Sequence, residues 1–159
     1  MGRGHTFMDE IFEKPDYDPD DQGSFKQNLV FVAMPFLGED VKEKYSAIKD
    51  ECSKLGLNAR RVDENIGSGL IIKEITELIE EAEFIIFDLT QERPNVYYEL
   101  GYAHGVGNEP LDILLIAKEG TKIHFDIAPM RIHFYRTTEH LRSIIASNLK
   151  EMIYKTRAY

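Results

Sequence analysis

The chain has 159 residues, of which 43% are hydrophobic and 30% are charged, and its formal net charge is -9 at pH 7. These values are typical of one globular domain, and the negative charge argues against nucleic acid as the main partner, because phosphate backbones are bound by clustered Lys and Arg. No apolar run approaches the ~20 residues of a membrane-spanning helix and the start lacks the apolar core of a signal peptide, so we expect a cytoplasmic protein with no membrane partner.

The N-terminal region, residues 1–27, differs in character from the rest of the chain. Its acidic stretch, Asp16–Gly23, is rich in turn-forming residues and has no hydrophobic periodicity. The spacing of its acids does not match the loop of a calcium-binding EF-hand. We therefore expect a flexible acidic arm over residues 1–27 and one α/β domain over residues 28–159.

From residue 29 onward, apolar runs typical of buried strands alternate with segments of helical periodicity. Such alternation predicts a parallel sheet with right-handed crossovers. We expect a flavodoxin-like (Rossmann-like) α/β fold with five parallel strands in the order 2-1-3-4-5 and helices on both faces. The predicted strands are 29–34, 58–62, 83–88, 112–117 and 132–135, and the predicted helices are 40–55, 70–81, one that starts near Asn95, and 139–154.

Apolar side chains at helical spacing predict which face of each helix packs on the sheet. Cys52 falls on such a stripe, so we interpret it as a buried spacer rather than a reactive thiol. As the single cysteine, it cannot form an intrachain disulfide, and it argues against a zinc cluster. The expected inner positions are Val41, Tyr45, Ile48, Cys52 and Leu55, then Ile71, Ile75, Leu78 and Ala82, and finally Leu141, Ile144, Ile145, Leu149, Met152 and Ile153.

The junction between the third strand and the next helix, residues 84–104, carries the most chemistry. The apolar strand ends in Asp88, and a proline suited to the first turn of a helix follows, so Asn95 and Glu99 fall on one helix face with Tyr102 beyond them. Ligands of open parallel sheets bind outside the carboxyl ends of the strands, at a switch point expected here between the first and third strands. These side chains therefore predict a small-molecule site.

Loops that leave the neighbouring strands supply further candidates. Pro35 and Phe36 follow the first strand, and Phe36 either stacks on a base or folds back onto the core. Asp63 and Gly69 flank the glycine-containing loop after the second strand, which either binds a phosphate at a helix start or is a plain helix entry. Asp126, after the fourth strand, either reaches the site or caps a turn.

Two stretches resemble the nucleoside 2-deoxyribosyltransferase-like superfamily. They are Phe31–Phe36 and the run from Asp88 to Ala103, which contains Tyr98-Glu99-Leu100-Gly101, and the resemblance continues to about Tyr135. The resemblance implies that Glu99 is the nucleophile that attacks the anomeric carbon of the sugar. It also implies that Asp88 is the carboxylate that faces the base.

The segment Arg93–Val96, followed by Glu99, also resembles TIR-like nucleotide-binding domains, whose glutamate cleaves the nicotinamide–ribose bond of NAD. The deoxyribosyltransferases usually carry an aspartate at the position of Asn95 to hold sugar hydroxyls, so this departure weakens the implied preference for deoxyribose. Arg93 is a candidate cation for a nucleotide phosphate.

Both resemblances imply chemistry at an N-glycosidic bond. Departure of the base leaves positive charge on the sugar, which a carboxylate such as Glu99 stabilises or traps as an ester, and Asp88 is a candidate to protonate the base. Tyr98 or Tyr102 orients Glu99 or packs in the core. No ligand spacing indicates a metal, so we expect a mechanism without metal or cofactor.

Three functions fit this sequence: an enzyme that cleaves or exchanges the N-glycosidic bond of a nucleoside or nucleotide, a TIR-like NAD-cleaving effector, and a nucleotide-binding sensor without turnover. In the sensor, Glu99 would only hold a ribose hydroxyl. The superfamily's transferases are oligomers, and residues 155–159 form a basic, aromatic tail. We therefore also expect a homo-oligomer.

Overall fold

The computed structural model describes residues 26–35, 38, 40–62, 68–90, 101–103, 105, 110–123 and 131–157. Within these residues, five strands form one sheet in the order β2-β1-β3-β4-β5, and every neighbouring pair is parallel. The flavodoxin-like order predicted from the sequence is confirmed. The strands are β1 (Lys26–Ala33), β2 (Asn58–Arg60), β3 (Ala82–Asp88), β4 (Ile113–Lys118) and β5 (Ile132–Tyr135).

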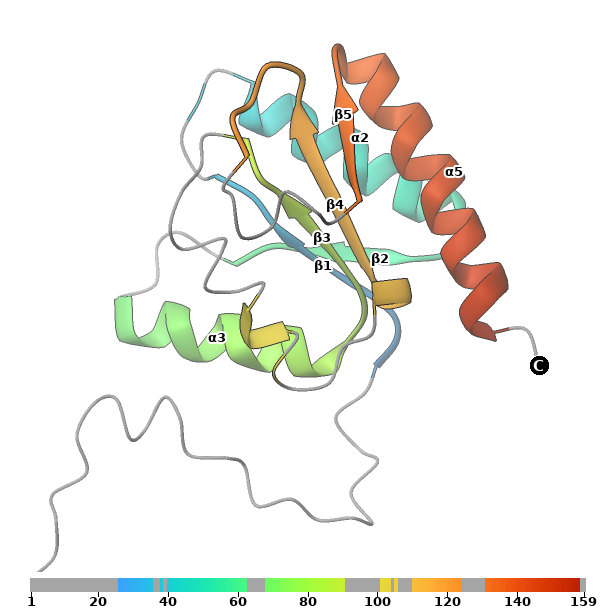
Figure 1. Cartoon of the computed structure of the whole chain (residues 1–159). Coiled ribbons are helices and arrows are strands. Elements are labelled where there is room, and N and C mark those ends of the chain that lie inside the picture. Colours follow the sequence, from blue (N-terminus) through green and yellow to red (C-terminus); the bar gives the residue numbers. More distant parts are fainter. Residues whose placement is uncertain are drawn as a thin grey trace, which may run out of the picture.

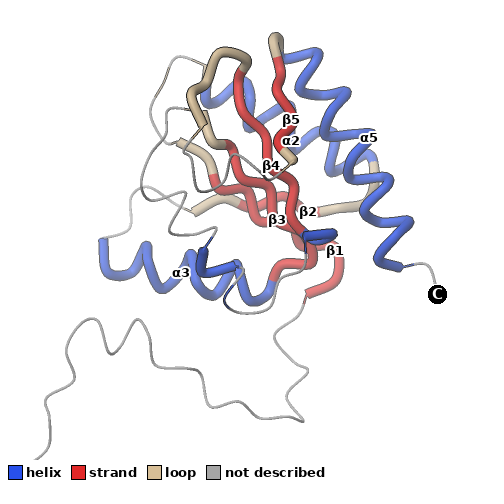
Figure 2. The backbone as a smooth tube through the Cα atoms, viewed as in Figure 1, coloured by secondary structure: helices blue, strands red, loops and turns tan. Residues whose placement is uncertain are grey.

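Helices cover both faces of the sheet, as the sequence predicts. In Figure 1, α2 and α5 lie together on one face and α3 lies on the other, and the tube in Figure 2 shows the strands between these two layers. No helix in the described part of the chain is long and apolar enough to cross a membrane. The helices are α2 (Val41–Lys54), α3 (Ser68–Glu81) and α5 (Thr138–Arg157), with a short 3-10 helix η1 (Pro110–Asp112) before β4.

One hydrophobic core fills the space between the sheet and the α2/α5 layer. The apolar stripe predicted for α2 faces this core, where Ile48 and Cys52 are fully buried. The stripe predicted for α5 does the same, because Leu141, Ile145 and Leu149 are fully buried and Ile153 packs against them.

A second core lies on the α3 side of the sheet. Ile75, Leu78 and Ala82 belong to it, as predicted, whereas the side chain of Ile71 lies outside the described residues. All seven residues of β3 are buried, which confirms the prediction that this central strand is covered on both faces. Since β3 is the central strand, its carboxyl end lies at the middle of the carboxyl edge of the sheet.

Local signals set the ends of two helices. Gly56 adopts a positive φ of 74°, and the backbone N–H groups of Gly56 and Leu57 bind carbonyl groups in the last turn of α2, which is how a glycine commonly ends a helix. Thr137 precedes α5 and accepts a hydrogen bond from the His140 backbone N–H at 3.1 Å, so it acts as an N-cap.

Some boundaries differ from those expected. β1 begins at Lys26 rather than at residue 29. The prediction missed residues 26–28 because they are exposed and polar and therefore carry no hydrophobic signal. Asn28 has a positive φ of 71°, and the pairing of β1 with β3 shifts register between Lys26 and Val30. At the other end of the domain, α5 continues to Arg157, three residues past the predicted end at 154.

We expect Cys52 to be chemically silent in the native protein. Its side chain is fully buried, and burial together with the nearby charge of Glu51 raises the pKa of the thiol to about 12. Because the thiolate is the reactive form, a disulfide reagent at pH 8 should not react with folded protein but should modify one thiol per chain in guanidinium. Rapid stoichiometric modification of the native protein would contradict this prediction.

Candidate active site at the carboxyl edge of the sheet

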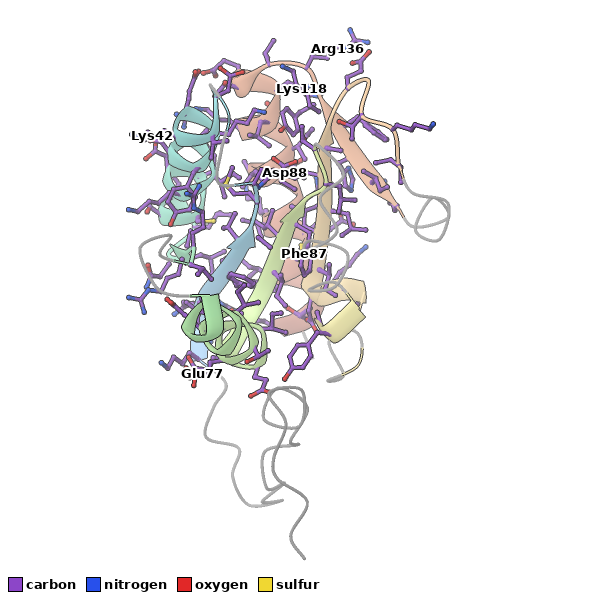
Figure 3. The ribbon with its side chains drawn as sticks, turned by 90° about the vertical axis from the view of Figure 1, so that its left-hand side faces the viewer. Lys42, Glu77, Phe87, Asp88, Lys118 and Arg136 are labelled. Carbon is purple, nitrogen blue, oxygen red and sulfur yellow. The ribbon has the colours of Figure 1, made fainter. Side chains whose placement is uncertain are left out.

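The ends of β1 and β3 meet at the predicted switch point. These strands are neighbours in register, with Ala33 opposite Phe87, so Pro35 and Asp88 lie where adjacent parallel strands end. Figure 3 labels Asp88 at the end of β3, with Lys118 of β4 at the same end of the sheet. The structure thus brings Pro35 and Asp88 to one edge, which is the edge where ligands of this fold bind.

Asp88 is almost completely buried, with 1% of its surface exposed. Its Oδ1 accepts hydrogen bonds from the Thr90 backbone N–H at 2.9 Å and from the Thr90 hydroxyl at 2.5 Å. Its Oδ2 accepts a hydrogen bond from the Tyr135 hydroxyl at 3.1 Å. Both oxygens of this buried carboxylate are therefore hydrogen-bonded, as buried charged groups require.

Tyr135 ends β5 and is 1% exposed. Burial, and then the negative charge of Asp88, raise the pKa of the Tyr135 hydroxyl well above its usual value. The phenol therefore stays protonated and remains a donor throughout the physiological pH range. The ammonium group of Lys44, on α2, lies 5.3 Å from the centroid of the Tyr135 ring and places a positive charge beside this group.

Asp88 and the helical segment 101–103 belong to opposite sides of the sheet. Along β3, Phe84 and Ile86 face the α2/α5 core, and the alternation of side chains puts Asp88 on the same side. Tyr102 and Ala103 instead belong to the core on the α3 side. A ligand that contacts both Asp88 and the segment on the α3 side would therefore have to lie across the carboxyl edge of the sheet.

Tyr102 is bound to α3. Its hydroxyl donates a hydrogen bond of 2.6 Å to Oε1 of Glu80, which lies one residue before the end of α3 and close to the start of β3. This contact fixes the segment that follows Glu99. The predicted contact of Tyr102 with Glu99 or a substrate stays a prediction.

Gly69 is the second residue of α3, so it lies at a helix start, as expected.

Seven predicted site residues lie outside the described part of the chain. Two residues that sequence reasoning did not select, Thr90 and Tyr135, are bound directly to Asp88. Thr90 had a local signal, because a hydroxyl residue near an aspartate often forms side-chain hydrogen bonds within a turn. In the described ranges, no group of three His, Cys, Asp or Glu residues is arranged to hold a metal. The seven residues are Phe36, Asp63, Arg93, Asn95, Tyr98, Glu99 and Asp126.

No protein-family model and no curated protein matches the sequence. Among solved structures, the chain is similar to the CMP N-glycosidase BcmB of Clostridium botulinum, with 16% identity, a TM-score of 0.59, and coverage of 72% of this chain and 95% of that one. It is also similar to a 2-deoxyribosyltransferase of Bacillus psychrosaccharolyticus, with 16% identity, a TM-score of 0.55, and coverage of 72% and 90%.

A flavo di-iron protein of Thermotoga maritima has a part with the same arrangement. It is 13% identical, with a TM-score of 0.57 and coverage of 80% of this chain but only 37% of that protein. The likenesses confirm the expected nucleoside 2-deoxyribosyltransferase-like fold. Because one fold serves several kinds of protein, the activity must be argued from the site residues.

Proposed function

We propose that the protein cleaves or transfers the N-glycosidic bond of a nucleoside or nucleotide, with Glu99 as the nucleophile. The observation that carries this proposal is the position of Asp88, a buried carboxylate at the β1–β3 switch point, eleven residues before the glutamate of the Glu99-Leu100-Gly101 unit. A fold shared with an N-glycosidase and a 2-deoxyribosyltransferase over most of their lengths supports it.

The proposed reaction has two steps. The bond between C1′ and the base nitrogen breaks, its electron pair leaves with the base, and an oxygen of Glu99 bonds to C1′. Water or a second base then attacks C1′ and releases Glu99. Water gives hydrolysis, and a second base gives transfer.

Asp88 is the proposed carboxylate on the base side of this reaction. Its oxygens already accept hydrogen bonds from Thr90 and Tyr135. A proton carried by Asp88 to the leaving base would therefore have to replace or share one of these bonds. The hydrogen bonds also hold the carboxylate in a fixed orientation at the edge of the sheet, which is what a positioned acid or electrostatic group needs.

The test is release of free base, measured by chromatography after incubation with matched substrates. The panel contains nucleosides, nucleoside monophosphates and NAD, in ribose and deoxyribose forms where these exist, with and without a second base as acceptor. Each reaction is run with and without a chelator, because two carboxylates should suffice without a metal. We expect base release from a nucleoside or nucleotide.

Each alternative function has its own outcome in this panel. Release of nicotinamide alone would favour the TIR-like NAD-cleaving function. Binding of a nucleotide by calorimetry without release of any base would favour the sensor. Activity that disappears with the chelator and returns with a divalent ion would contradict the proposed metal-free mechanism.

Asn95 is expected to widen the choice of sugar. An aspartate at this position would bind sugar hydroxyls with charge assistance, which makes such hydrogen bonds roughly twice as strong as neutral ones, whereas an amide both donates and accepts. We predict that ribosyl substrates react at least as fast as deoxyribosyl ones and that Asn95→Asp shifts the preference toward deoxyribose. The measurement is the ratio of kcat/KM for a matched pair of substrates in both proteins.

A strong native preference for the deoxy substrate, left unchanged by Asn95→Asp, would show that this position does not read the sugar. The control is the same substitution on α5, Asn148→Asp, far along the sequence from the proposed site. The side-chain amide of Asn148 donates a hydrogen bond to the Ile144 carbonyl. This control should leave the substrate ratio unchanged.

A further inference from the structure

Thr90 is the last described residue before the segment that carries Glu99, and its hydroxyl joins three strands. The hydroxyl donates to Oδ1 of Asp88 at 2.5 Å and accepts from the Lys118 backbone N–H at 2.9 Å. It also lies 3.2 Å from the hydroxyl of Tyr135. Residues of β3, β4 and β5 are thus bound to one another through a single side chain, immediately before residue 91.

The backbone at this point is also attached to the sheet. The Leu89 N–H donates to the Ile116 carbonyl of β4 at 2.8 Å, and the Thr90 N–H donates to Asp88 at 2.9 Å. The chain is therefore fixed up to Thr90. Asp88, Thr90 and Tyr135 thus form one hydrogen-bonded cluster at this strand end.

The hydroxyl of Tyr135 is bound to the two other members of the cluster. The residue is 1% exposed, and its ring packs in the α2/α5 core. Its hydroxyl binds Oδ2 of Asp88, while the Thr90 hydroxyl binds Oδ1. Among the described residues, the Tyr135 hydroxyl contacts Asp88 and Thr90, so its effect on the reaction would pass through these two side chains.

We propose that Tyr135 is a positioning residue for the reaction at this edge, because its hydroxyl fixes the side chains of Asp88 and Thr90. The inference rests on the proposed function. Its physical basis is that a catalytic group displaced by about 1 Å loses much of its effect. The hydrogen bond from the Tyr135 hydroxyl, on β5, to Asp88, on β3, restricts such a displacement of the Asp88 carboxylate.

The matched pair of variants is Tyr135→Phe and Tyr45→Phe. Each removes one hydroxyl and keeps the ring. Tyr45, on α2, packs against the same core, but within the described residues no hydrogen bond links it to the cluster. We expect Tyr135→Phe to lower kcat at least about tenfold, the effect of one hydrogen bond to a carboxylate, with KM unchanged. Tyr45→Phe should change neither constant.

Thr90 provides a second test. Thr90→Val keeps the shape of the side chain but removes the hydroxyl, and it should lower kcat as Tyr135→Phe does. Thr90→Ser keeps the hydroxyl and should retain most of the activity. Thr90→Ser loses a methyl group but keeps the hydrogen bond. If it stays active while Thr90→Val does not, the loss in Thr90→Val comes from the missing hydrogen bond and not from poorer folding.

Amide hydrogen exchange measures the cluster without reference to activity. The amides of Thr90 and Lys118 are both bound inside it, so we expect them to exchange at least about tenfold faster in Tyr135→Phe than in Tyr45→Phe. Unchanged exchange at both amides would overturn the positioning role, whatever the activity. Faster exchange with an unchanged kcat would overturn it as well.

The two proposals fail separately. If the wild-type protein releases no base from any substrate of the panel, the proposed function is wrong, and the exchange of Thr90 and Lys118 still decides whether Tyr135 fixes this strand end. The positioning role is supported if the wild-type protein is active and Tyr135→Phe has two effects. It lowers kcat without changing KM, and it speeds hydrogen exchange at the Thr90 and Lys118 amides.

Discussion

Replacing Glu99 with alanine is expected to abolish release of the base while leaving the fold intact. Without a nucleophile, the developing charge on the sugar is neither trapped nor stabilised, so kcat should fall at least about a thousandfold. The melting temperature should stay nearly the same, or rise slightly, because carboxylates kept for catalysis often cost stability. The measurements are the rate of base release by chromatography and thermal unfolding by circular dichroism.

Two further variants make this result specific. Glu99→Gln keeps the size of the side chain and removes its charge, so it should lose as much activity as Glu99→Ala. Glu139→Ala changes a glutamate whose side chain is 87% exposed in the first turn of α5, and it should retain full activity. Turnover of Glu99→Ala at a substantial fraction of the wild-type rate would mean that another group attacks the sugar.

The order of strands and the packing faces of the helices could be predicted from hydrophobic periodicity. β5 was predicted at its observed bounds, 132–135, because its short apolar run follows a loop and precedes a strongly periodic helix. The inner faces of α2 and α5 follow from spacing alone. Periodicity reports burial, and the predicted inner faces of α2 and α5 are the sides of these helices that are buried.

Two of the missed boundaries, the start of β1 and the end of α5, lie where polar residues rather than burial of apolar surface extend an element. Residues 26–28 of β1 are exposed, and Asn28 takes a conformation that strands rarely use. The last turn of α5 ends at Arg157, which binds Glu83 at the start of β3, 74 residues earlier in the sequence. A local pattern contains no information about such a distant partner.

The same distinction holds for the candidate site. Asp88 could be placed at the carboxyl edge because it ends an apolar strand, and the strand order then put it beside Pro35. Its partner Tyr135 lies 47 residues away, so that contact requires the three-dimensional order of β3, β4 and β5. Tyr102 shares a predicted helix face with Glu99, but the observed partner of its hydroxyl is Glu80, on a different helix.

Arg157→Ala is expected to cause the largest loss of stability among the surface-accessible variants, although Arg157 lies far along the chain from the site. Glu83 is buried, with 8% of its surface exposed, and it is bound by the Arg157 guanidinium through both carboxylate oxygens, with Nε at 3.1 Å from Oε2. The Asn28 backbone N–H also donates to Glu83, at 3.3 Å, and the Arg157 guanidinium donates to the Asn28 side-chain oxygen at 2.8 Å. The arginine therefore joins the end of α5 to the starts of β1 and β3.

Removing the guanidinium would leave the Glu83 carboxylate buried without its cation, a change that typically costs about 3 kcal/mol. For a domain of this size, that corresponds to a fall in melting temperature of roughly 6–12 °C.

The matched control is Lys155→Ala, two residues earlier on α5, where Lys155 and Glu151 form an exposed pair at 2.6 Å. Such exposed pairs contribute little to stability, so the control should be nearly neutral in urea unfolding. The double variant Glu83→Gln with Arg157→Ala should recover part of the loss, because no charge then remains buried. Equal small losses for Arg157→Ala and Lys155→Ala would mean that solvent or another group satisfies Glu83 once the arginine is gone, and that the end of α5 does not hold the strands together.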